Sequence, residues 1–188
     1  MAPTSGLTRR SFLQVATTLA GGLALTACTS MPAIAQARTR AETVKADVEE
    51  VLPVEDLMRE HGVLRRLLLV YGEAIRRMEA SEPLDPAIVS RSATLIRRFI
   101  EDYHEKNEED YLFPRFQEAG KLVDLVRVLK EQHEAGRRVT ARVLDLATAA
   151  GMSRSEDRTA LVTELRRFIR MYEPHSARED TVLFPAFR

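Results

Sequence analysis

The sequence predicts an all-α protein, an up-down-up-down bundle of four helices built from two repeated helical hairpins. Two observations predict this class. Apolar residues recur at helical spacing in four long stretches after residue 53, and few runs alternate as strands do. The connections between these stretches are short, which favours antiparallel neighbours in a bundle.

Composition narrows the class of protein. The chain has 188 residues, of which 45% are hydrophobic and 30% are charged, enough for one domain with a full core. Basic and acidic residues balance at 28 each, so no nucleic-acid partner is expected. The single cysteine, Cys28, excludes an internal disulfide and a cysteine-based zinc site.

Residues 1–28 are predicted to be a signal peptide. Arg9 and Arg10 precede Phe12 and Leu13, and residues 15–27 carry no charge, which is the order of a secretory signal. The paired arginines resemble those of a twin-arginine signal. The apolar stretch is too short to span a bilayer core of roughly 30 Å, so we expect it to be removed. This predicts export to the periplasm of a bacterium.

Two cleavage positions stay open. Residues 25–28, Leu-Thr-Ala-Cys, resemble a lipoprotein box, in which Cys28 is lipidated and anchors the protein to the membrane. The alternative is a cut after Ala35, which would release a soluble protein. Residues 29–52 have little periodicity and are predicted to form a linker or N-terminal arm. The helical domain then covers residues 53–188.

The four helices can be placed from their start and stop signals. The first runs from Pro53 to a break at residues 81–86, where Asp85 is the expected N-cap of the second. The second helix runs to about Gln117, and Gly120 is its predicted stop signal. The third covers about 122–151, and the fourth begins near Ser155 and continues past residue 180.

The two hairpins repeat a histidine pattern. His61 precedes His104 by nearly the same separation as His133 precedes His175, and the letters RRFI stand before the second histidine of each pair. Each second helix then reads His-x-x-x-Glu. Residues four apart lie on one helix face, so each such pair presents an imidazole and a carboxylate to one point in the core.

This pattern predicts a metal site. A buried glutamate is costly unless it is paired or bound to a cation. Four imidazoles and two carboxylates, with no sulfur ligand, suit two first-row metal ions, each with two histidines and with both carboxylates shared. The alternative is a structural bundle without metal, whose histidines are hydrogen-bonded core residues. The predicted ligands are His61, His104, Glu108, His133, His175 and Glu179.

The pattern resembles the hemerythrin-like (HHE) family over residues 54–188. The resemblance rests on the four histidines, the two His-x-x-x-Glu motifs and a Leu-Phe-Pro sequence after each, at residues 112–114 and 183–185. It implies two non-haem iron ions, bridged by carboxylates and an oxo or hydroxo group, that meet oxygen, peroxide or nitric oxide. Manganese stays open as the metal.

One position departs from the family pattern. Oxygen-carrying members have His-x-x-x-His on the third helix, but here Arg137 stands in the place of the fifth histidine. This predicts a symmetric site with two histidines per metal and open positions, and it argues against reversible oxygen carriage. Asp180 is a second candidate for the bridging acid. Further candidates for donors to the site are Tyr103, Tyr111 and Tyr172.

The sequence thus predicts a cell-envelope protein that binds or senses a small diatomic ligand or iron, since no substrate pocket or electron-donor motif is visible. The alternative is a di-iron enzyme that reduces peroxide or nitric oxide, because uncovered iron is a reactive centre. Oligomeric state and physiological ligand stay open.

The two Leu-Phe-Pro sequences are expected to pack aromatic rings at the bundle end and to stop regular helix at Pro114 and Pro185. Gly136 leaves space either for a ligand or for close helix packing.

Overall fold

The computed structural model describes residues 52–187. The expected signal peptide, Cys28, the alternative cleavage position after Ala35 and the segment up to residue 51 lie outside these residues. Within them the chain is helical and has no strand. None of the described helices combines the length and the apolar composition needed to cross a membrane.

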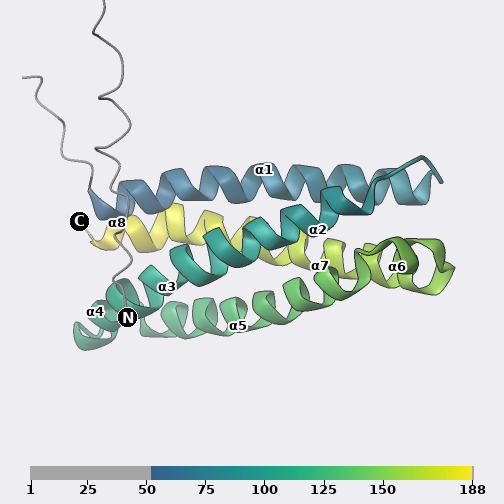
Figure 1. Cartoon of the computed structure of the whole chain (residues 1–188). Coiled ribbons are helices and arrows are strands. Elements are labelled where there is room, and N and C mark those ends of the chain that lie inside the picture. Colours follow the sequence, from purple (N-terminus) through teal and green to yellow (C-terminus); the bar gives the residue numbers. More distant parts are fainter. Residues whose placement is uncertain (1–51, 188) are drawn as a thin grey trace, which may run out of the picture. The chain divides into compact units, whose positions relative to one another are not determined.

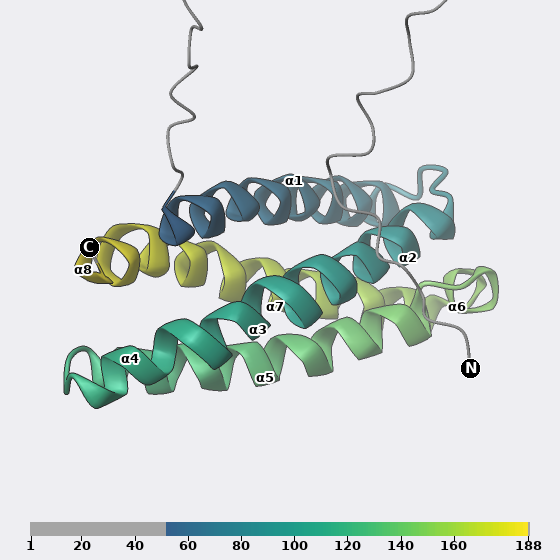
Figure 2. The same cartoon turned by 60° about the vertical axis from the view of Figure 1, so that its left-hand side comes forward.

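The predicted all-α bundle is confirmed. The first helical course is α1 (Pro53–Glu79), and the third is α5 (Val123–Leu146). The second course contains α2 (Pro86–Leu95), η2 (Ile96–His104), α3 (Glu105–Asn107), η3 (Glu108–Leu112) and α4 (Phe113–Glu118). The fourth contains α7 (Ser155–Arg178), η4 (Glu179–Leu183) and α8 (Phe184–Phe187). Two views show these courses lying side by side, with α7 packed against both α1 and α5 (Figures 1 and 2).

Local signals account for the helix starts. The Asp85 carboxylate caps α2 by accepting the N–H of Ala87 at 2.9 Å, and Pro86 occupies the first turn, where a missing N–H costs nothing. Helix α1 has acidic residues in its first turn and Arg76 and Arg77 in its last, which matches the helix dipole.

The third helix ends earlier than predicted, at Leu146 and not near Gly151. After Leu146 the chain folds back into a short helix, α6 (Ala149–Ser153), whose start is capped by Thr148: its hydroxyl accepts the N–H of Gly151 at 3.0 Å. A Cβ on Gly151 would lie 2.2 Å from the carbonyl oxygen of Leu146, so the fold-back needs glycine there. The sequence prediction took this glycine as a helix stop when it belongs to a separate turn.

The Leu-Phe-Pro sequences do not end their helices. The leucine of each ends a wide π-helical turn, η3 or η4, and the helix then resumes at the phenylalanine as α4 or α8. The N–H of Phe113 donates to the carbonyl of Glu108, and that of Phe184 to the carbonyl of Glu179, five residues back in each case. Proline lacks an N–H and crowds the carbonyl four residues before it, which disfavours regular α-helix ahead of Pro114 and Pro185. The chain therefore widens a turn where we predicted a stop.

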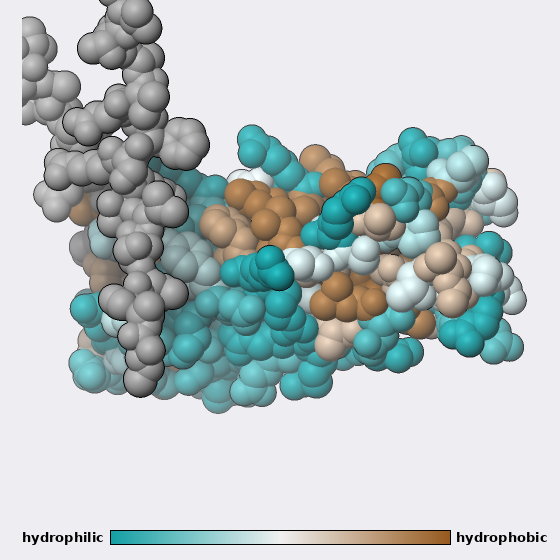
Figure 3. Space-filling model, in the orientation of Figure 1, coloured by the Kyte–Doolittle hydropathy of each residue, from teal (hydrophilic) through white to brown (hydrophobic). Residues whose placement is uncertain are grey.

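The apolar core has two parts separated by a polar layer. The larger cluster contains residues such as Leu64, Ile100 and Phe168, and the smaller contains Phe113, Leu129 and Phe184 among others. Along each of the four courses, one histidine lies between the part that enters the larger cluster and the part that enters the smaller. The surface of the described residues is mostly hydrophilic on the face in view, with apolar patches near its middle (Figure 3).

Candidate metal centre

Six buried side chains meet in the polar layer between the two apolar clusters. His61 comes from α1, His133 from α5 and His175 from α7, and His104 ends η2. The two carboxylates, Glu108 and Glu179, each begin a π-helical turn. None of the six is more than 2% exposed. The structure thus brings together all six residues that the sequence predicted as ligands.

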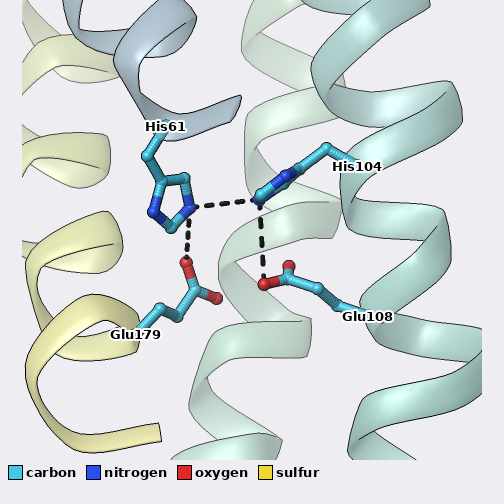
Figure 4. Close-up of side chains that lie close together, drawn as sticks. All are labelled: His61, His104, Glu108 and Glu179. Atoms are coloured by element: carbon cyan, nitrogen blue, oxygen red, sulfur yellow. Dashed lines mark hydrogen bonds and ion pairs between the residues drawn. The ribbon is translucent and has the colours of Figure 1, made fainter. Parts of the chain in front are cut away.

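The first hairpin brings two imidazoles together, with their Nε2 atoms toward each other and their ring planes tilted by 54°. Nε2 of His61 lies 3.0 Å from Nε2 of His104 and 3.3 Å from Oε2 of Glu179, as Figure 4 shows. Nε2 of His104 lies 3.7 Å from Oε1 of Glu108. The nitrogens and the carboxylate oxygens therefore point into one small space.

The second hairpin repeats this arrangement. Nε2 of His133 lies 3.2 Å from Nε2 of His175, which in turn lies 3.2 Å from Oε2 of Glu179. Oε2 of Glu108 lies 3.4 Å from Nε2 of His133. Each carboxylate therefore reaches the histidine pair of both hairpins, as shared ligands must.

These side chains fit cations. Both oxygens of Glu108 and both oxygens of Glu179 are buried without a hydrogen-bond partner, which is costly unless a cation binds them. The candidate ligand atoms form two overlapping groups, each within 4.8 Å, which share Glu179. First-row metal ions bind nitrogen and oxygen at about 2.0–2.2 Å, which sets neighbouring ligand atoms about 3 Å apart. The spacing and the donor types suit two such ions.

The outward nitrogen of every imidazole has a fixed partner. Nδ1 of His61 lies 2.8 Å from Asp180, that of His104 lies 2.9 Å from Glu60, and that of His133 lies 3.0 Å from Glu109. For His175 the partner is the amide oxygen of Gln132, at 2.9 Å. These partners accept hydrogen bonds, so each Nδ1 donates and each Nε2 is the nitrogen that faces the centre and could bind a cation.

Sequence reasoning missed most of these outer partners. Asp180 was a candidate bridging acid, but it lies on the outward side of His61, where Arg65 also pairs with it. The repeat held the signal for the others. Glu60 and Gln132 directly precede the first histidine of each hairpin, and Glu109 and Asp180 directly follow the shared carboxylates.

Arg137 occupies a third group of potential ligands. Its guanidinium lies 2.7 Å from Glu109 and 3.0 Å from Glu105, and these two acids with His133 are the remaining cluster that could hold a metal among residues 52–187. A fixed cation is therefore already present where the family pattern has a fifth histidine. Burial raises the pKa of Glu105 to about 8, and its carboxylate accepts the hydroxyl of Tyr172 at 2.6 Å.

The three candidate tyrosines have different positions. Tyr172 is buried and its ring centroid lies 5.4 Å from that of His175, close to the centre. Tyr103 and Tyr111 are 49% and 63% exposed, so the structure places them at the surface and not in the buried layer. The space beside Gly136 is filled by the Tyr172 hydroxyl, from which a Cβ would be 2.0 Å away. That space serves close packing and not a ligand.

The buried carboxylates and imidazoles of the centre shift one another's pKa values. Burial, together with repulsion from Glu179, raises the pKa of Glu108 well above its usual value. Burial lowers the pKa of His61, but the Asp180 carboxylate, which accepts the Nδ1 hydrogen bond, and the nearby Glu179 carboxylate outweigh burial and raise the value to about 9. Burial lowers the pKa of His133 to about 4. The centre therefore holds protons that a cation would displace.

The Leu-Phe-Pro phenylalanines close the centre toward the bundle end. The ring of Phe184 stacks on His61 with centroids 5.6 Å apart, and that of Phe113 stacks on His133 at 5.5 Å. Each motif thus supplies the π-helical turn that begins at a shared carboxylate and the ring that covers an imidazole of the same layer.

Comparison with known proteins agrees with this geometry. The family model for the hemerythrin HHE cation binding domain matches residues 52–187. The chain belongs to this family. Uncharacterized proteins of Mycobacterium tuberculosis and Mycobacterium bovis are 46% identical to this hemerythrin HHE protein over 186 residues, which cover 99% of this chain and 72% of theirs. No solved structure matches it. The family's cation-binding description is consistent with the buried histidine and glutamate cluster.

Proposed function

We propose that this hemerythrin HHE protein holds two iron ions in the polar layer and binds or senses a small ligand, either oxygen or nitric oxide. The observation that carries the proposal is the convergence of four Nε2 atoms and two unpartnered carboxylates on one buried space. When bound, the iron pair would supply redox-active Lewis acidity. Manganese is the alternative metal that the same donors would accept.

The chain's own residues favour a small ligand. The six ligands are at most 2% exposed, and Phe113 and Phe184 cover the layer toward the bundle end. This burial favours a ligand of a few atoms over a larger substrate. The outer partners, among them Asp180 and Glu60, hold the imidazoles in one orientation before any ligand arrives.

One observation favours a second function, reduction of peroxide or nitric oxide. Arg137 stands in the position of a fifth histidine and its guanidinium is engaged by Glu105 and Glu109. The six side chains would offer at most eight donor atoms to two metal ions, and no fifth histidine adds a ninth, so a substrate could reach the metals.

Nitric oxide consumption separates these functions. The full-length chain is loaded with ferrous iron without oxygen and given excess nitric oxide and a reductant. Binding predicts uptake that stops at a fixed ratio per chain and is absent in His104→Ala. Sustained consumption that exceeds that of free iron and is lost in His104→Ala would favour the enzyme instead.

We further propose that the protein is exported by the twin-arginine route and anchored through a lipid on Cys28. The support is the sequence of residues 1–28 alone. Mass spectrometry of the protein recovered from its native membranes tests this. A lipidated N-terminal cysteine is expected, and Cys28→Ala should release the protein from the membrane. A mature N-terminus at Gln36 would instead support the soluble form.

A further inference from the structure

A surface cavity of about 380 Å³ lies against the outer side of the metal centre. Its walls come from α1, the second helical course and the C-terminal α8. Apolar side chains such as Leu57, Leu112 and Phe187 line it, together with the exposed rings of Tyr103 and Tyr111. A volume of this size is within the range of small-molecule sites, roughly 300–1,000 Å³.

Glu60 joins this cavity to the centre. The residue lines the cavity, and its side chain is 16% exposed. Its Oε2 accepts the hydrogen bond from Nδ1 of His104 at 2.9 Å, while the structure shows no partner for Oε1 in the part of the chain that it describes. A donor placed in the cavity can therefore reach a carboxylate that holds a histidine of the metal centre.

The internal duplication shows that this side of the centre is specialised. Glu60 of the first hairpin matches Gln132 of the second, so the acid occurs on one side alone. The aromatic walls differ in the same way. In the second hairpin, the positions that correspond to Tyr103, Asn107 and Tyr111 hold Pro174, Arg178 and Val182. The candidate metal ligands repeat in both halves, and so do the apolar lining residues Leu57 and Leu112, as Leu129 and Leu183, but the acid and the aromatic walls do not.

The charges of the cavity define what it would accept. Two acids, Asp56 and Glu60, lie one turn apart on α1 and would repel an anion. The one basic residue of the lining, Arg115, is held by two other residues of the wall: its Nη1 donates to the carbonyl of Tyr111 at 2.7 Å, and its guanidinium lies over the ring of Phe187. Aromatic walls favour a flat ring, and a carboxylate favours a hydrogen-bond donor.

We propose that this cavity binds a small uncharged aromatic molecule with a hydroxyl group, of the phenol or hydroquinone class, whose hydroxyl donates to Glu60. The inference goes beyond the proposed function, because it requires only the fold and the Glu60 carboxylate. A bound phenol would lie one hydrogen bond from His104 and outside the metal layer.

The test is calorimetric titration of the full-length chain with 4-ethylphenol and with its methyl ether, 4-ethylanisole. The two probes have the same ring, but the ether has no donor. We expect the phenol to bind and the ether to bind at least about tenfold more weakly, the effect of a lost hydrogen bond to a charged group. Benzoate should also bind more weakly than the phenol, because the two acids repel it.

Two variants locate the site. Leu57→Trp fills the cavity and should weaken phenol binding at least about tenfold. Tyr111→Ala removes an exposed aromatic wall that touches none of the six ligands, and it should weaken phenol binding about threefold. Leu69→Trp is the matched control, since Leu69 lies on the same helix, is 75% exposed and does not line this cavity. Equal binding of phenol and ether, no phenol binding at millimolar concentration, or full affinity in Tyr111→Ala would each overturn the proposal. Metal content, measured on the same samples, reports separately on the proposed function.

Discussion

His61 illustrates how the centre is set up by single residues. Its Nε2 faces the other ligands, while its Nδ1 donates to Asp180, which lies 119 residues away in the chain. This pairing raises the pKa of the imidazole to about 9 against the opposing effect of burial. The raised pKa favours the charged imidazole at neutral pH, and a bound metal would have to displace its proton.

We expect metal binding to release this proton. Because the pKa of His61 is raised, metal affinity should increase with pH up to about 9 and level off above it. Asp180→Asn removes the main hydrogen bond that raises the pKa, so fewer protons should be released at pH 7.5. Calorimetry in buffers of different ionisation enthalpy measures this number, with Asp145→Asn, at an exposed site, as the control. Equal proton release in Asp180→Asn and the wild type would contradict the role given to Asp180.

Gly136 is the second residue with a defined structural task. A Cβ there would lie 2.0 Å from the Tyr172 hydroxyl, which is itself held by Glu105. Gly136→Ala should lower the free energy of unfolding by about 1–3 kcal/mol through overpacking. Gly72→Ala is the matched control, because nothing lies within 4 Å of a Cβ at Gly72, and alanine there should stabilise α1 by about 1 kcal/mol. Denaturant unfolding measures both; opposite signs are expected, and a neutral Gly136→Ala would contradict the packing role.

At the scale of elements, the π-helical turns position the shared carboxylates. Glu108 begins η3 and Glu179 begins η4, and each turn ends directly before a Phe-Pro pair. The sequence showed the prolines and the aromatic residues but not the widened turns. A single extra residue in a turn shifts the apolar periodicity by one position, which a stretch of this length does not distinguish from ordinary variation.

Pro185→Ala tests the role of the widened turn. With an N–H at residue 185, the carbonyl of Thr181 gains a donor and the turn can return to regular α-helix, which would move Glu179. We expect metal affinity to fall about tenfold, as for other changes that reorient ligands, while helix content by circular dichroism stays unchanged. Pro83→Ala, in the loop before α2, should leave affinity at the wild-type value. Unchanged metal affinity in Pro185→Ala would show that the π-helical turn is not needed to place the Glu179 carboxylate.

The sequence predicted the helices well because long amphipathic stretches carry a strong periodic signal, and it identified the six side chains that meet in the polar layer because they repeat. It did not predict the outer partners of the imidazoles. Asp180 contacts a histidine of the other hairpin, and so does Glu109, so both pairings depend on how the two hairpins dock. Glu101 and Glu105 were also missed, although their spacing places them on the inward face that holds Glu108.

At the scale of the whole bundle, the proposed metal centre would cross-link the two hairpins. Each hairpin supplies two histidines and one shared carboxylate, so neither half completes the site alone. Metal should therefore stabilise the folded bundle. At a free metal concentration one hundred times the dissociation constant, we expect the free energy of unfolding to rise by about 2.7 kcal/mol, with reversal by a chelator. Thermal unfolding with and without metal measures this, and an unchanged midpoint would argue against binding to the folded state.

Metal content in three isosteric variants tests the central claim most directly. Glu108→Gln and Glu179→Gln each alter a shared carboxylate, and Glu101→Gln is the matched control, because Glu101 is equally buried on the same helical course but lies outside the six ligands. After loading with ferrous iron without oxygen, elemental analysis should find two irons per chain in the wild type and in Glu101→Gln. It should find close to none in either of the other two, since each shared carboxylate serves both ions. Fewer than one metal per wild-type chain, or full occupancy in Glu108→Gln or Glu179→Gln, would contradict a shared two-metal centre.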